Sequence, residues 1–441
     1  MRDRLWGRKL LTLALTAALA LSTAGCGEQE NTEKVDNSAD ESTSVVSEES
    51  SIPEETPAED TLSLPTAFLS DTDMELADMW AGCDDRALAA VMRKAETGEK
   101  VTIACIGGSI TQGTIASGKR DTEVGERKAY ADRFFDWWEE RFPETEFQFV
   151  NAGIGGTDSY LGVHRLERDV LDSEPDLVLV EFAVNDGNNS FYKKSYDNLI
   201  YNLLTDDAAP AVICLFMAQT SGISAQTSEV LVGYHYSVPM LSYANVISDM
   251  IETGRYTAKE LSGDGVHPSA LGHAVTGEIL WNYLNGVYEV RNTLEEPDAD
   301  AVTEPLTKAV YGKAAVLDSS VITPEEYGDF AEEKSSQQFP NGWGCNGEGG
   351  IVFRASFSRL GILYLATTDG KSGQFEVLID GEPVRTIDAD FTGGWGNAIK
   401  ADEVYASDTV GEHTVELRRS ENATGDIFHL LGLLTSESIT D

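Results

Sequence analysis

The stretch Val-Thr-Ile-Ala-Cys-Ile-Gly-Gly-Ser-Ile-Thr, residues 101–111, decides the fold of this chain. Its first six residues are almost continuously apolar, and such a run predicts a β-strand that is covered on both faces. The run ends in two glycines followed by Ser109. A residue that directly follows a strand of a parallel sheet lies at the edge where such sheets bind ligands. The stretch therefore predicts a buried strand and a candidate functional serine.

Three further apolar runs follow and alternate with amphipathic segments. The apolar runs lie at 147–151, 177–182 and 211–217, and the amphipathic segments lie at 130–142, 159–172, 196–204, 242–253 and 269–285. This alternation predicts βαβ units, and hence a parallel sheet between two layers of helices. We assign residues 61–290 to this α/β domain.

Residues 305–441 show a different pattern. Apolar and polar residues alternate over 375–379 up to Asp380-Gly381, which is a strong signal for a two-residue β-hairpin turn. Further strand candidates lie at 363–366, 413–417 and 427–434. The pattern predicts a smaller C-terminal all-β sandwich domain. The acidic residues 291–304 are the expected linker.

The chain is strongly acidic. Its 441 residues contain 75 Asp and Glu against 32 Lys and Arg, which gives a formal net charge of −43. This charge argues against binding to nucleic acid or to an anionic membrane surface, because both are polyanions. Residues 26–60 hold twelve of the acids, one base and no aromatic residue. Such a segment buries too little apolar surface to fold, so we expect an acidic disordered tether there.

The first 25 residues have the pattern of an export signal. A basic start precedes a short apolar run at 10–21, which is too short to span a bilayer core. The run ends in Thr-Ala-Gly-Cys26, which resembles the lipobox of bacterial lipoproteins. The resemblance implies that residues 1–25 are a lipoprotein signal peptide and that Cys26 anchors the exported protein to the membrane at the bacterial cell surface. An ordinary cleaved signal with an unrelated cysteine is the alternative.

The remaining cysteines predict neither a metal site nor a disulfide framework. The chain has no Cys-x-x-Cys pair and no Cys/His cluster. Cys105 and Cys214 lie inside apolar runs, where a thiol behaves as a small buried apolar group. We expect no metal.

A serine nucleophile needs a base within hydrogen-bond reach, and the chain has six histidines. His267 is the strongest candidate because Asp264 precedes it by three residues, across Gly265. An Asp at this spacing can fold back on one imidazole nitrogen, fix the tautomer and stabilise the imidazolium, as in a serine triad. The alternative is an Asp that caps a turn beside a surface histidine.

Two other predicted strands end in residues that can stabilise an oxyanion. Asn185 follows the strand at 177–182, and the pair Gly155-Gly156 follows the strand at 147–151. An amide side chain and a glycine N–H are both suitable donors. Both residue types are also common in ordinary turns, which is the alternative.

Four motifs resemble, in order and context, those of the SGNH hydrolase superfamily of GDSL-like lipases and acylhydrolases. They are GGSIT at 107–111, NAGIGG at 151–156, AVND at 183–186 and DGVHP at 264–268. The resemblance implies a flavodoxin-like three-layer α/β/α fold that needs no cofactor. Glycine replaces the Asp of the GDS motif, and Ala183 stands where a glycine is usual.

The resemblance also assigns roles to residues. Ser109 is implied as the nucleophile, His267 as the general base and Asp264 as the third triad member. The implied oxyanion hole consists of the Ser109 N–H, the Gly156 N–H and the Asn185 side chain. Gly155 is a competitor for the position of Gly156.

GDSL-like proteins with an accessory β domain resemble bacterial carbohydrate esterases. We therefore expect a serine esterase that hydrolyses short-chain esters, above all acetyl groups on carbohydrates, through an acyl-enzyme. Trp343 and Trp395 each lie between two glycines and could stack on a sugar, with core packing as the alternative. Two other functions stay open: a lipase or lysophospholipase on the same triad, and a non-catalytic glycan-binding surface protein. The expected partners are an acylated carbohydrate and, through the lipid anchor only, a membrane.

Overall fold

The computed structural model describes residues 68–79, 82–121, 124, 126–298, 304–421 and 423–438. The expected signal peptide at 1–25, Cys26 and the tether at 26–60 lie outside these residues. Thr61–Asp441 form one compact unit. None of the helices in the described ranges has both the length and the apolar character that a membrane crossing requires.

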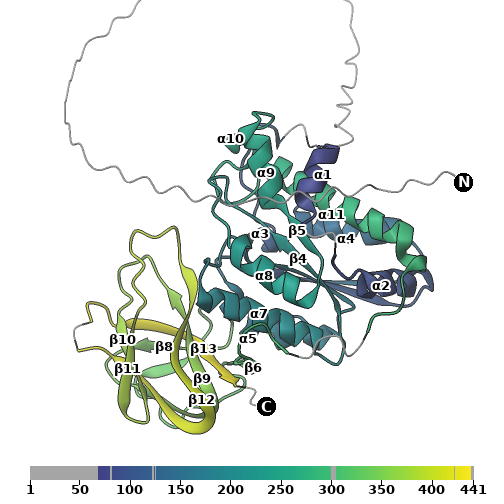
Figure 1. Cartoon of the computed structure of the whole chain (residues 1–441). Helices are drawn as coiled ribbons and strands as arrows, with labels where there is room; N and C mark the ends of the chain where they lie inside the picture. Colours follow the sequence, from purple (N-terminus) through teal and green to yellow (C-terminus); the bar gives the residue numbers. More distant parts are fainter. Residues whose placement is uncertain are drawn as a thin grey trace, which may run out of the picture. The chain divides into compact units, whose positions relative to one another are not determined.

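The α/β domain is built on a five-stranded parallel sheet (Figure 1). The strands are β1 Val101–Gly107, β2 Phe147–Gly153, β3 Leu177–Glu181, β4 Ala211–Phe216 and β5 Met240–Ser242. Their order in the sheet is β2-β1-β3-β4-β5, so the direction of winding reverses between β1 and β3. Ligands of such sheets bind outside the carboxyl ends of the strands at this reversal. The predicted α/β class with a parallel sheet is confirmed.

Helices cover both faces of this sheet (Figure 1). On one face α2 Arg86–Glu96, α4 Tyr130–Arg141, α9 Tyr243–Glu252 and α11 Ala270–Val290 form one core, and on the other α5 Ser159–His164, α7 Ser190–Leu204 and α8 Gln226–Tyr236 form a second. Shorter helices are α1 Asp71–Ala77, α3 Ser109–Gln112, α6 Leu166–Asp169, η2 Leu171–Ser173, α10 Ala258–Leu261 and η3 Arg291–Thr293. Ile103 and Cys105 of β1 enter the first core, and Ala104 and Ile106 enter the second. Alternate side chains of a strand face opposite ways, which explains why a strand covered on both faces is continuously apolar.

The predicted helix at 159–172 is interrupted at Arg165. The side chain of Arg165 is fully buried, and its guanidinium donates to the carbonyl oxygens of Gly107 and Ala152 at 3.0 and 2.7 Å. The chain continues as the short elements α6 and η2. The amphipathic pattern predicts a continuous helix because it does not account for a charged side chain that is buried against the strand ends.

The C-terminal domain is entirely β and antiparallel. Its strands are β6 Gly312–Leu317, β7 Phe330–Glu333, β8 Gly342–Asn346, β9 Ile351–Ala366, β10 Gln374–Ile379, β11 Glu382–Asp388, β12 Ala398–Arg419 and β13 Ile427–Glu437. The order is β11-β10-β12-β9-β13-β8-β7, with β6 beside β13. Hydrogen bonds join these strands into one continuous sheet. The two longest strands, β9 and β12, stay paired along their length despite two shifts of register. The predicted all-β class is confirmed.

The turn between β10 and β11 has the predicted geometry. Asp380 and Gly381 have φ angles of 54° and 85°. Positive φ at both central residues is the requirement of a type I′ turn, whose twist matches that of the strands it joins. Ile379 and Glu382 pair directly across this turn.

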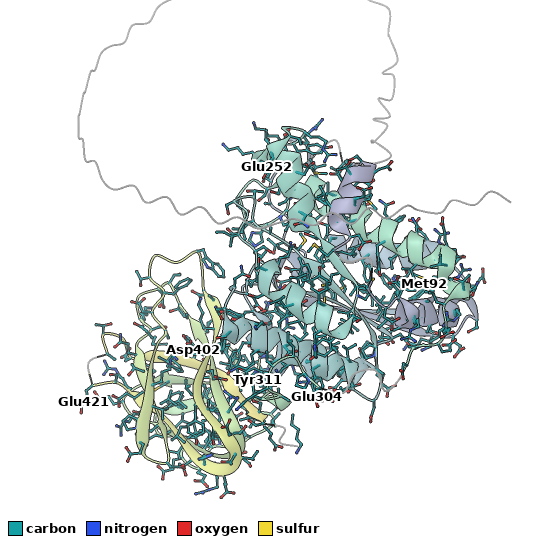
Figure 2. All side chains as sticks on the ribbon, viewed as in Figure 1. Met92, Glu252, Glu304, Tyr311, Asp402 and Glu421 are labelled. Atoms are coloured by element: carbon teal, nitrogen blue, oxygen red, sulfur yellow. The ribbon has the colours of Figure 1, made fainter. Side chains whose placement is uncertain are left out.

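The segment that leads into the β domain is held against α7. Asp197 of α7 accepts hydrogen bonds from the Thr307 N–H and hydroxyl at 2.6 and 2.5 Å. Tyr311, labelled in Figure 2, packs its ring against Tyr160 and His164 of α5, with ring centres 5.7 and 5.4 Å apart. Part of the expected linker, residues 299–303, lies outside the described ranges. Within the compact unit, the β domain thus shares a core with the α/β domain.

Candidate active site

Ser109 is the first residue of α3 and follows β1 after a single residue, Gly108. Its side chain therefore lies at the carboxyl edge of the sheet, where the winding reverses. The two preceding glycines are required by close contacts. A Cβ at Gly107 would lie 2.1 Å from Thr111 Oγ1 and 2.4 Å from the Glu181 carbonyl oxygen. The backbone can make this tight strand-to-helix turn only without a side chain at that position.

The structure brings the three predicted triad residues together. Ser109 Oγ lies 2.9 Å from Nε2 of His267, and Nδ1 of His267 lies 2.8 Å from Oδ2 of Asp264. The other Asp264 oxygen accepts hydrogen bonds from the N–H groups of Val266 and His267, both at 2.8 Å. The turn from 264 to 267 thus folds the carboxylate back onto the imidazole, and both oxygens of the carboxylate are engaged.

The surroundings of Asp264 favour its ionised form. Burial acts to raise the pKa of this carboxyl, but hydrogen bonds from the His267 side chain and from two backbone N–H groups outweigh it. Their combined effect lowers the pKa of Asp264 to about 2. The group is therefore a carboxylate at neutral pH and can stabilise a positive charge on the imidazole.

The two glycine candidates for an oxyanion donor differ in their hydrogen bonds. The Gly155 N–H donates to Oε1 of Gln112 at 2.9 Å. The Gly156 N–H has no hydrogen bond within the described part of the chain, and Gly156 is exposed with a φ of 72°. The side chain of Asn185 lines the same cleft as Ser109 and Gly156. Of the two glycines, Gly156 has the N–H group that is available to a ligand.

Three residues outside the predicted set hold the loops of this site. Gln112 fixes Gly155, as described above. Asn151 donates to the carbonyl oxygen of Thr111 at 2.9 Å and accepts from the Gly153 N–H at 3.0 Å. Arg165 links the ends of β1 and β2 because its guanidinium donates to a carbonyl oxygen of each strand. Arg165 gives a weak signal in the sequence, as a charged residue in an amphipathic segment. Asn151 is the first residue of the NAGIGG motif, although the motif assigns it no role, and Gln112 gives no signal.

A cleft of about 800 Å³ opens over Ser109 and is lined from both domains. The β domain contributes Ser335, Ser336, Gln337, Gln338, Leu365, Trp395, Asn397 and Ile399. No Lys or Arg is among the described lining residues, and Asp264 is the one carboxylate there. Elsewhere too, the described residues contain no group of three or more His, Cys, Asp or Glu that could hold a metal ion. The lining combines apolar side chains with uncharged polar ones and therefore favours an uncharged ligand.

The two candidate tryptophans have different environments. Trp343 of β8 has no exposed surface and packs in the core of the β domain. Trp395 is 73% exposed, and its ring atom Cη2 lies 3.3 Å from the point that a Cβ of Gly156 would occupy. Core packing is therefore the correct interpretation for Trp343. Trp395 instead overhangs the cleft beside the free N–H of Gly156.

Comparison with known protein families gives a match over most of the α/β domain. Residues 105–275 match the GDSL-like Lipase/Acylhydrolase family. This domain is a GDSL-like lipase/acylhydrolase domain. The family consists of carboxylic ester hydrolases, and the matched range contains Ser109, Gly156, Asn185, Asp264 and His267.

Two solved structures of a two-domain esterase resemble the chain beyond the GDSL-like domain. A two-domain esterase (CEX) active on acetylated mannans is 29% identical, over 83% of this chain and 99% of that protein, with a TM-score of 0.74. The same esterase co-crystallized with mannopentaose gives the same identity and coverage with a TM-score of 0.72. Axe2, an acetylxylan esterase from Geobacillus stearothermophilus, is 18% identical over 43% of this chain and 96% of its own, with a TM-score of 0.35. Comparison with curated protein sequences gives no match.

The GDSL-like domain accommodates its two departures from the family motif. A Cβ at Gly108, the position of the usual Asp, would lie 2.3 Å from Oδ1 of Asn185. Glycine at this position therefore lets the Asn185 amide pack against the residue that precedes Ser109. Ala183 is fully buried, and its carbonyl oxygen accepts from the Ala225 N–H at 2.6 Å, so the loop that carries Asn185 is anchored.

Proposed function

We propose that this protein is a serine esterase that removes acetyl groups from uncharged carbohydrate chains. The observation that carries the proposal is the hydrogen-bonded series from Ser109 through His267 to Asp264, at the base of a cleft that both domains line. The likeness over both domains to an esterase active on acetylated mannans supports a glycan as the substrate.

The geometry supports acyl transfer through a covalent intermediate. Ser109 Oγ attacks the ester carbonyl carbon while Nε2 of His267 takes its proton. The resulting oxyanion accepts hydrogen bonds from the N–H groups of Ser109 and Gly156 and from the Asn185 amide. His267 then gives the proton to the departing sugar oxygen. Water attacks the acetyl carbon with His267 again as the base; the bond from that carbon to Ser109 Oγ then breaks, His267 returns the proton to Oγ, and acetate leaves.

The cleft also supports the choice of an uncharged sugar. Hydroxyl and amide side chains of 335–338, together with Asn397, offer donors and acceptors for sugar hydroxyls. Trp395 presents an exposed ring beside the proposed oxyanion hole, where the face of a pyranose can stack. A cleft without lining cations gives no compensation for an anionic substituent.

The proposed activity is tested by acetate release from acetylated mannan, acetylated xylan and acetylated pectin, alongside aryl esters from acetyl to dodecanoyl. We expect acetate from the two neutral glycans, little from the acidic pectin, and aryl ester rates that fall about tenfold or more from acetyl to the longer chains. A preference for long acyl chains would instead indicate a lipase. Binding of glycan without hydrolysis of any ester would contradict an enzymatic role.

Replacing Trp395 with alanine tests the contribution of the β domain. We expect the KM for acetylated mannan to rise about tenfold, because the stacking surface is lost, and the aryl acetate kcat/KM to stay within about twofold. Initial rates on both substrates measure the effect. Val384→Ala, which removes another exposed apolar side chain of the β domain, is the control. An unchanged KM for mannan in the Trp395 variant would show that the ring does not contact the glycan.

A further inference from the structure

A second cavity, of about 410 Å³, shares no lining residue with the catalytic cleft. Its walls are the first turn of α7, the segment that leads into β6, and one side chain of β9. Four of its lining residues are basic: Lys193, Lys194, Lys308 and Arg359. Four cations around one cavity are a strong local excess in a chain whose formal net charge is −43.

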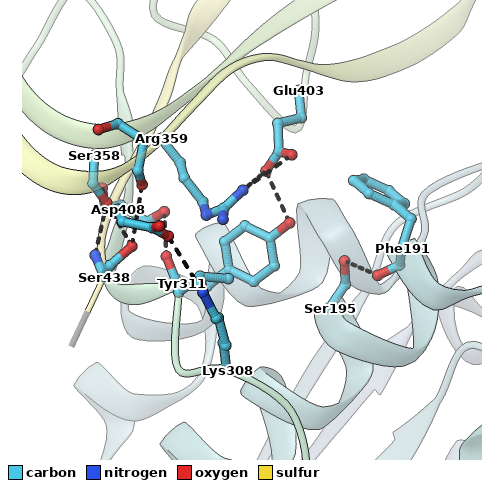
Figure 3. A network of polar contacts seen from close by, with 12 residues as sticks. Phe191, Ser195, Lys308, Tyr311, Ser358, Arg359, Glu403, Asp408 and Ser438 are labelled. Carbon is cyan, nitrogen blue, oxygen red and sulfur yellow. Dashed lines mark hydrogen bonds and ion pairs between the residues drawn. The ribbon is translucent and has the colours of Figure 1, made fainter. Parts of the chain in front are cut away.

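Carboxylates neutralise only part of this charge. Nη1 of Arg359 lies 3.4 Å from both oxygens of Glu403, and Glu403 Oε2 also accepts from the Tyr311 hydroxyl at 2.9 Å (Figure 3). Lys308 lies 3.6 Å from Asp408, but both side chains are more than three-quarters exposed, so solvent weakens this pair. Lys193 and Lys194 have no ion pair within the described residues. The four cations exceed the two carboxylates that pair with them by two charges. A third carboxylate, Asp197, is held by the N–H and hydroxyl of the lining residue Thr307, so a positive excess remains.

Two of the cations lie beside the same aromatic ring in a partly dry environment. Nζ of Lys194 and the guanidinium carbon of Arg359 each lie 5.9 Å from the centre of the Tyr311 ring. Arg359 is only 9% exposed, and its Nε has no hydrogen-bond partner. Burial, followed by the charge of Arg359, lowers the pKa of Lys194. A buried donor without an acceptor, beside uncompensated ammonium groups, is unfavourable unless an anion binds there.

The helix α7, which forms one wall of the cavity, also favours a bound anion. Ser190, the first residue of α7, lines the cavity together with Phe191. The N-terminus of a 15-residue helix carries a partial positive charge and favours an anion nearby. The lysines and Arg359 supply the formal charge, and the helix adds to it.

We infer that this cavity is a second binding site, which takes a dianionic group of the phosphate class. The excess of cations favours a group with more than one negative charge, and ammonium and guanidinium donors suit the several oxygens of a tetrahedral anion. The volume exceeds that of a phosphate ion, so a phosphate ester also fits. This site is separate from the proposed ester chemistry and does not depend on it.

Calorimetric titration of the full chain at constant ionic strength tests this site. The probes are inorganic phosphate, glycerol phosphate as the ester, and acetate as a monoanion. We expect saturable binding of both phosphates at one site, with acetate at least about tenfold weaker. Tighter binding of glycerol phosphate than of inorganic phosphate would identify an ester as the ligand, and the reverse would identify the free ion.

A pair of double variants separates a specific site from general charge. Lys193→Gln with Lys194→Gln is expected to weaken phosphate binding about tenfold or more. Lys313→Gln with Lys371→Gln removes the same charge from exposed side chains of the β domain and is expected to leave binding within about twofold. Circular dichroism establishes that both variants are folded. Absence of saturable binding, equal losses in the two variants, or acetate that binds as tightly as phosphate would each overturn the inference.

Discussion

Replacing Ser109 with alanine is expected to lower kcat for aryl acetate hydrolysis by about 10⁴-fold or more. The substitution removes the hydroxyl that lies 2.9 Å from Nε2 of His267, so neither the nucleophile nor its proton remains. The oxyanion donors and the cleft are retained, which leaves only the smaller acceleration that they provide to attack by water. Release of the phenol, followed by absorbance with purified protein, measures the loss.

The matched control for this substitution is Ser117→Ala. Ser117 is exposed in the loop that follows α3, and it is absent from the lining of the catalytic cleft. We expect the control to keep its rate within about twofold and the Ser109 variant to keep its unfolding midpoint close to that of the parent. A Ser109 variant that retains a tenth of the parent activity would place the nucleophile elsewhere.

The sheet could be predicted because its central strands are buried on both faces. Such strands are continuously apolar and stand out between amphipathic helices, as β1 and β4 do. β5, Met240–Ser242, is too short to produce a recognisable apolar run, so periodicity does not predict it. Periodicity does not predict the break at Arg165 either, because the break depends on carbonyl oxygens of two strands that are distant in sequence.

The proposed triad shows which parts of a site are local. Asp264 and His267 lie in one turn, and their contact follows from four consecutive residues, so the sequence was enough to expect it. The difference between Gly155 and Gly156 was not predictable, since it depends on Gln112 from another loop.

The part of the cleft wall that the β domain contributes depends on contacts between residues that are distant in the sequence. Trp395 lies more than 200 residues from Gly156 in the chain, and only the packing of the two domains brings them together. Periodicity and motifs describe each domain by itself and contain no information about that contact.

Replacing Asp264 with asparagine is expected to lower kcat for aryl acetate by about 10³- to 10⁴-fold while the fold is retained. The amide oxygen of asparagine can still accept the N–H groups of Val266 and His267. Its NH₂ group would then face Nδ1 of His267, in place of the carboxylate oxygen at 2.8 Å. That donor forces Nδ1 to accept, so the proton moves to Nε2, which can no longer take the proton of Ser109.

A second His–Asp pair in the β domain provides a control with matched geometry. Nδ1 of His413 lies 2.8 Å from Oδ2 of Asp380, whose other oxygen accepts from the Thr414 N–H at 2.9 Å. Neither residue lines the cleft, so Asp380→Asn is expected to leave kcat within about twofold. Comparable losses in both variants would mean that the effect is structural, and an unimpaired Asp264 variant would mean that His267 works without a carboxylate partner. A loss confined to the Asp264 variant is the result that the tautomer argument requires.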